Sequence, residues 1–91
     1  MFQIIQRTLN TNKRKENEKK YSNYEDLPNG SRLYWFEIEG RWGWKARYVK
    51  IADYNEVTIS FRQEIYNENK ILVEIHEKYP IDLGHIKIKT R

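Results

Sequence analysis

Residues 33–48 read LYWFEIEGRWGWKARY and contain all three tryptophans of the chain, with basic residues interleaved. In the first half, Tyr34, Phe36 and Ile38 alternate with their neighbours at a period of two, which is typical of a β-strand. Gly40 and Gly43 then bracket a turn, because glycine tolerates the positive φ that tight turns require. The stretch therefore predicts a β-hairpin.

Two further segments, residues 57–66 and 71–78, also alternate. Their inward residues are predicted to be Val57, Ile59, Phe61 and Ile65 in the first and Ile71, Val73 and Ile75 in the second. Loops of about two to five residues join all these segments, so consecutive strands should be antiparallel neighbours. We predict a mainly β, or α+β, fold: a small antiparallel meander sheet or open barrel of four to five strands, with residues 86–89 as the candidate fifth.

The segment from residue 44 to residue 52 has a conflict in its alternation. Trp44, Ala46 and Tyr48 lie on one face, whereas Val49 and Ile51 lie on the other. A β-bulge adds one residue to a strand and re-aims the side chains that follow it. We therefore predict a bulge near Tyr48.

Residues 1–30 are predicted to form a partly flexible N-terminal extension, with a short strand or helix, to a sheet domain of residues 31–91. Residues 10–20 contain no apolar side chain and cannot bury an apolar face, so we expect a mobile linker or a solvated helix. Residues 27–30 read LPNG, a turn signature because proline restricts φ and glycine permits positive φ. This turn is the predicted boundary of the sheet.

The composition limits the class of protein. Seventeen Lys and Arg against thirteen Asp and Glu give a formal net charge of +4 over 91 residues, which permits binding to polyanions without requiring it. The absence of cysteine excludes thiol nucleophiles and fits a reducing compartment. The chain has no run of about 18 apolar residues and no secretory signal. We expect a cytoplasmic protein without a membrane partner.

Aromatic and basic residues together are typical of single-stranded nucleic-acid binding, because bases stack on rings and phosphates contact cations. The predicted binding residues are Trp35, Arg41, Trp42, Trp44, Lys45, Arg47 and Arg62. Large rings also fill small cores, so we expect most of them to be structural and Trp42, at the turn, to be the most exposed. The leading hypothesis is a non-catalytic nucleic-acid-binding module.

A ribonuclease is the alternative. Pairing residues 57–66 with 71–78 across a tight loop places Arg62 opposite His76 and Glu64 opposite Glu74 on the outer face. These four side chains would supply the acid, the base and the phosphate-stabilising cation of a small toxin-like metal-independent ribonuclease. Solvent-facing strands also alternate charges for simple neutralisation. We therefore favour binding over catalysis.

Metal binding and protein interaction complete the alternatives. Glu74, His76, Asp82 and His85 are of the types that bind zinc or iron, but their spacing matches no standard motif. We therefore predict no metal ion and no cofactor. One face of the predicted sheet is apolar and needs a cover, which also makes a homodimer or another protein-interaction module a candidate.

Overall fold

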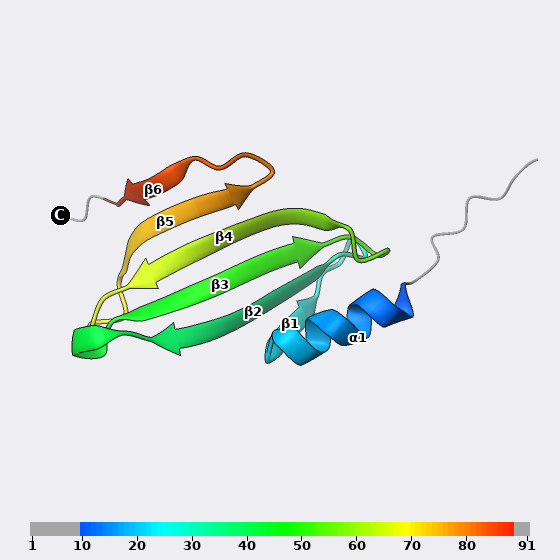
Figure 1. Ribbon diagram of the computed structural model, residues 1–91, viewed down its shortest axis with the longest axis horizontal. Coiled ribbons are helices and arrows are strands. Elements are labelled where there is room, and N and C mark those ends of the chain that lie inside the picture. Colours follow the sequence, from blue (N-terminus) through cyan, green and yellow to red (C-terminus); the bar gives the residue numbers. More distant parts are fainter. Residues whose placement is uncertain (1–9, 89–91) are drawn as a thin grey trace, which may run out of the picture.

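The computed structural model of this chain describes residues 10–88. Its elements are α1 (Thr11–Lys20), β1 (Asn23–Asp26), β2 (Arg32–Glu39), the short 3-10 helix η1 (Arg41–Gly43), β3 (Lys45–Ala52), β4 (Thr58–Tyr66), β5 (Leu72–Tyr79) and β6 (Gly84–Lys87). Within these residues, six strands form one antiparallel sheet in sequence order (Figure 1). The predicted mainly β meander is confirmed, with one strand more than the largest number expected.

The sheet begins before the predicted boundary. The LPNG turn joins β1 to β2, with the Leu27 amide donating to the Ser31 carbonyl at 2.9 Å and Gly30 at a φ of 86°. Of the two structures predicted for residues 10–20, the helix is observed and the mobile linker is not. The predictions for residues 1–9 and for Lys89 lie outside the described residues.

Helix α1 lies on one face of the sheet, beside β1 and β2 (Figure 1). We call this the helix-side face and the other the opposite face. Among the residues used below, the helix-side face carries Tyr34, Phe36, Tyr48, Phe61, Gln63 and His76. The opposite face carries Trp35, Glu37, Arg47, Val49, Arg62 and Glu64.

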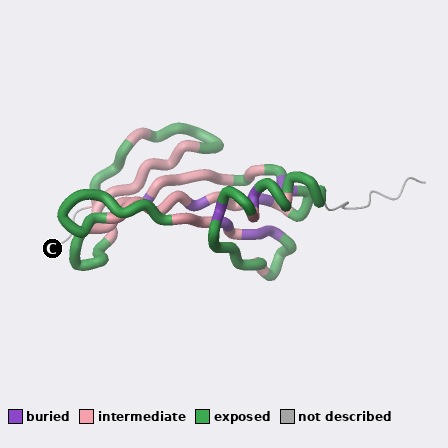
Figure 2. The backbone as a smooth tube through the Cα atoms, turned by 60° about the horizontal axis from the view of Figure 1, so that its bottom comes forward, coloured by how far each residue is buried: buried purple, intermediate pink, exposed green. Residues whose placement is uncertain are grey.

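A small aromatic core fills the space between the end of α1 and the sheet. Tyr21 packs on Tyr34 and Phe36 with ring centroids 5.7 and 5.4 Å apart. Tyr21, Tyr34 and Ala52 are each no more than 2% exposed. Figure 2 shows the buried positions gathered near the helix, whereas β5 and β6 are half-buried or exposed. The described part of the sheet is therefore a single layer away from α1.

Polar contacts attach α1 to the sheet, because the helix has no apolar residue. Glu56 is 2% exposed, and its carboxylate accepts hydrogen bonds from Tyr34 Oη at 2.6 Å, Arg14 Nε at 2.8 Å and Asn17 Nδ2 at 3.4 Å. A buried carboxylate is tolerated only when paired and hydrogen-bonded. These three donors, two of them from α1, satisfy that requirement.

The turn between β3 and β4 presents Glu56 to the helix. Its φ is 65°, a left-handed conformation that costs a non-glycine residue about 1 to 3 kcal/mol. Asp53 stabilises the turn, since its Oδ1 accepts the Asn55 and Val57 amides, both at 2.9 Å. A locally strained turn thus places the buried carboxylate that accepts two side chains of α1. Arg32 and Lys50 of the sheet also contact α1, at Glu18 and Asn17.

The predicted bulge near Tyr48 is wrong. Strands β2 and β3 pair without interruption along all eight residues of β3, and the first irregularity comes between Ile51 and Ala52, where Ile59 of β4 is the extra residue. The alternation conflict needs no bulge, because Val49 is buried on the opposite face, with 4% exposure. Strand β3 places apolar residues on both faces.

Replacing Glu56 with glutamine should lower the free energy of unfolding by about 2 to 3 kcal/mol, because charge-assisted hydrogen bonds to a buried group are lost. Urea unfolding followed by circular dichroism measures this. Glu68→Gln, at an exposed turn, is the matched control and should change stability by less than about 0.5 kcal/mol. Equal effects of the two substitutions would contradict the anchoring role of Glu56.

Tyr34 should make stability fall at alkaline pH. Burial and the Glu56 carboxylate raise the pKa of Tyr34 to about 12, against 10.0 for a free tyrosine. The unfolded chain releases this proton near pH 10 while the folded protein retains it, so stability is lost as pH rises from 10 to 12. In the Tyr34→Phe variant, the loss of stability between pH 10 and pH 12 should be smaller by about 2 to 3 kcal/mol. The control Tyr54→Phe should leave this loss unchanged. Urea titrations at several pH values across this range measure both.

Candidate functional site

The predicted outer-face cluster does not assemble. Glu64 pairs with Ile75 rather than Glu74, and Arg62 pairs with Glu77 rather than His76. Because opposed residues share a face, Arg62 and Glu64 lie on the opposite face while Glu74 and His76 lie on the helix-side face. The register predicted for the ribonuclease hypothesis is therefore wrong.

A bulge in β5 explains the error. The tight-loop register is present at Tyr66 and Leu72, but Glu74 already pairs with Ile65, which leaves Val73 without a partner. One extra residue shifts the rest of the strand by one position and exchanges its faces. A second shift between Phe61 and Arg62 leaves Lys78 as the extra residue farther along β5.

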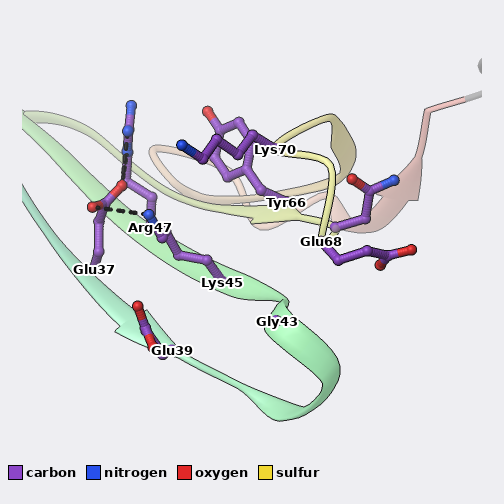
Figure 3. Close-up of a pocket in the computed structure, with 9 residues that line it drawn as sticks. Glu37, Glu39, Gly43, Lys45, Arg47, Tyr66, Glu68 and Lys70 are labelled. Atoms are coloured by element: carbon purple, nitrogen blue, oxygen red, sulfur yellow. Dashed lines mark hydrogen bonds and ion pairs between the residues drawn. The ribbon is translucent and has the colours of Figure 1, made fainter.

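On the opposite face, the predicted basic residues are paired with carboxylates. Arg47 contacts Glu37 through Nε at 3.0 Å and Nη2 at 2.8 Å, and Lys45 lies 3.5 Å from the same carboxylate. Figure 3 shows both cations pointing toward Glu37, beside a hollow of about 250 Å³. The hydrogen bonds from Arg47 hold the pKa of Glu37 below its usual value. Little positive charge is left free here.

Arg62 is paired in the same way. Its Nε donates to Glu64 at 2.7 Å, and Tyr66 Oη donates to the other carboxylate oxygen at 2.7 Å. Burial and the neighbouring Glu64 raise the pKa of Tyr66. Trp35 is half-buried and lines a hollow that it shares with Arg62 and Glu64. This group is a neutralised network on the sheet surface.

The β2–β3 turn presents the remaining predicted residues. Trp42 is 82% exposed, which confirms the prediction that it is the most exposed of the tryptophans. It has a φ of 57°. Arg41, Trp42, Trp44 and Glu68 line a shallow hollow of about 630 Å³. This tip projects at the end of the sheet farthest from α1 (Figure 1).

The helix-side face carries a continuous row of side chains from five strands. Its members, each opposite the next, are Phe36, Tyr48, Gln63, His76 and His85. We call this set the cross-strand row. The Phe36 and Tyr48 rings stack with centroids 4.9 Å apart and planes 16° apart, and Gln63 Nε2 donates to Tyr48 Oη at 3.1 Å. The row offers flat rings at one end and imidazoles at the other.

Lysines flank these rings. Lys78 Nζ lies 5.6 Å from the Tyr48 ring and 5.8 Å from the Phe61 ring, and Lys20 and Lys50 lie 5.7 and 5.9 Å from Tyr21. Burial lowers the pKa of Lys50, and the nearby Lys20 charge lowers it further. Within residues 10–88, none of these three lysines forms an ion pair. Lys50 Nζ donates a hydrogen bond to Asn17 Oδ1 of α1 at 3.0 Å.

A hollow beside the row is lined by two of these lysines and by further aromatic side chains. Its volume is about 470 Å³, and its lining includes Lys20, Lys50, Phe61 and Tyr79. The β5 bulge at Lys78 places Tyr79 opposite Phe61. The helix-side face is therefore concave, aromatic and positively charged next to α1.

Glu74, His76, Asp82 and His85, whose side chains are of types that bind metals, lie together at the β5–β6 hairpin. His76 Nδ1 lies 3.1 Å from His85 Nε2, His76 Nε2 lies 2.6 Å from Asp82 Oδ1, and His85 Nδ1 lies 3.4 Å from Glu74 Oε2. The Gly84 amide donates to Asp82 at 2.9 Å. This bond and the contact with His76 lower the pKa of Asp82.

The sequence analysis did not single out Tyr48, Phe61, Lys50 and Lys78. A signal was present, since Lys50 follows Tyr48 by two residues and therefore shares its face of the strand. Lys78 gave no such signal, because it reaches these rings only through the bulge.

No family model, curated protein or solved structure matches this chain. Within residues 10–88, no helix has the length and apolar character to cross a membrane. The geometry of the site is therefore the basis for any functional inference.

Proposed function

We propose that this protein binds single-stranded nucleic acid on the helix-side face of its sheet, without catalysis. The observation that carries the proposal is the contrast in charge between the two faces. Lys45, Arg47 and Arg62 on the opposite face are paired with Glu37 or Glu64. Lys50 and Lys78 on the helix-side face lie against aromatic rings and form no ion pair among the described residues.

Unpaired cations favour phosphate binding. A lysine already bound to a carboxylate must lose that contact before it can neutralise a phosphate, whereas a free lysine only releases counterions. Lys20 and Lys50, which have no carboxylate partner among the described residues, line a hollow together with Phe61 and Tyr79. The proposed ligand is therefore the one expected from the sequence, but the proposed binding surface is the helix-side face and not the face that carries Trp35.

The rings supply the second half of the interface. Phe36, Tyr48 and Phe61 are half-buried and not enclosed in the core. Their planes are within 21° of the neighbouring ring, and the Tyr48 and Phe61 centroids lie 6.4 Å apart. Base stacking on such a platform contributes about 1 to 3 kcal/mol per base and tolerates any sequence. An aromatic sheet face of this kind usually stacks two or three bases.

Charge removal tests which face binds. Lys78→Gln should weaken binding to oligo-uridine or oligo-thymidine and lower the slope of log K against log salt by about 0.7, the value for one phosphate contact on a single strand. Lys45→Gln removes the same charge from the opposite face and should leave the slope unchanged. Fluorescence anisotropy at several salt concentrations measures both. A larger effect of Lys45→Gln would contradict the proposed face.

Ring removal tests stacking. Tyr48→Leu should cost about 1 to 3 kcal/mol of binding free energy, because one stacked base is lost. Tyr54→Leu, in the β3–β4 turn, is the control and should bind as the unaltered protein does. Trp42→Ala locates a competing site: a loss of affinity confined to this variant would place nucleic acid at the β2–β3 turn and overturn the proposal.

A further inference from the structure

The β5–β6 hairpin brings the only two histidines of the chain into contact. His76 and His85 are cross-strand partners, and their ring centroids lie 4.3 Å apart. The facing atoms are His76 Nδ1 and His85 Nε2, at 3.1 Å. The sequence spacing of these residues matches no standard metal motif, so the contacts of these two atoms are the relevant observation.

Two carboxylates lie against the outer ring nitrogens. Asp82 Oδ1 lies 2.6 Å from His76 Nε2, and Glu74 Oε2 lies 3.4 Å from His85 Nδ1. A carboxylate accepts and cannot donate, so the short contact with Asp82 requires the hydrogen of the His76 ring on Nε2 and leaves a lone pair on Nδ1. When the hydrogen of the His85 ring is on Nδ1, toward Glu74, His85 Nε2 also presents a lone pair, and a cation between the two rings relieves the repulsion. In the other tautomer, His85 Nε2–H donates to His76 Nδ1.

We infer that His76 Nδ1 and His85 Nε2 bind a divalent transition-metal ion. Zinc–nitrogen bonds of about 2.0 to 2.1 Å separate two tetrahedral ligands by roughly 3.3 Å, close to the 3.1 Å between these atoms. Metal-binding histidines characteristically donate their other N–H to a carboxylate. Asp82 and Glu74 lie where such partners belong, and imidazole suits zinc, copper and nickel.

The protein supplies only part of the coordination shell. Within residues 10–88, no three His, Asp or Glu side chains are grouped to hold one ion, so the remaining positions go to water or to an outside ligand. The His85 side chain is 50% exposed, which gives an ion access from solvent. This inference is independent of nucleic-acid binding, because its ligands are neither lysines nor stacked rings.

Titration calorimetry of tag-free protein with zinc chloride, and separately with copper sulfate, tests the site. One ion should bind per chain. His85→Gln should reduce affinity at least tenfold because a ligand is lost. Glu74→Gln and Asp82→Asn should each reduce it about 10-fold or more, the usual effect of losing such a partner. Glu77→Gln, on the same strand but the other face, is the matched control and should have no effect.

Two results would overturn the inference. One is the absence of binding to the unaltered protein, which would mean that only a shared proton lies between the rings. The other is binding that His85→Gln leaves unchanged. Nitrogen-15 spectra of the imidazoles guard against misfolded variants: zinc should shift His76 Nδ1 and His85 Nε2 in the unaltered protein and leave the protonated Nε2 and Nδ1 in place.

Discussion

The buried carboxylate of Glu56 joins the helix, a turn and the centre of the sheet. Helix α1 is too polar to bury an apolar face, so it docks through Arg14 and Asn17 onto this carboxylate, with a further ion pair from Glu18 to the sheet. Tyr34 Oη completes the set from the centre of the sheet. Because a buried charge is costly without such partners, the helix, the β3–β4 turn and the aromatic core depend on one another.

This mode of docking leaves most of the helix-side face uncovered. One ten-residue helix covers only the β1–β3 end of the sheet, and β4 to β6 have nothing above them in the described chain. The two faces then differ in charge balance: carboxylates neutralise the cations of the opposite face, while Lys50 and Lys78 lie on aromatic rings. An uncovered aromatic surface with free positive charge favours a polyanion that also presents flat bases.

The β-bulges decide which side chains share a face. The bulge at Val73 places His76 on the helix-side face, away from Arg62 and Glu64. The uninterrupted pairing of β5 with β6 then sets His76 opposite His85. Lys78, the extra residue of the next bulge, lies over two rings of the helix-side face. Single-residue insertions in β5 therefore decide which face of the sheet carries His76 and bring Lys78 onto the aromatic rings, as bulges commonly re-aim side chains.

Sequence periodicity and turn chemistry predict β2 to β5, their antiparallel order and the exposure of Trp42, and give β6 as a candidate, because these are local properties. Strand β1 was not predicted, because its four exposed residues carry no alternating pattern. The sequence by itself did not determine register, because a bulge depends on contacts with the neighbouring strand and moves every later side chain to the other face. It also did not predict the anchor, since Arg14 and Glu56 are 42 residues apart and their pairing depends on the turn that buries Glu56. Strand pairing and bulges, which join residues distant in sequence, set the face on which Lys50 and Lys78 lie without carboxylate partners among the described residues and bring His76 to His85.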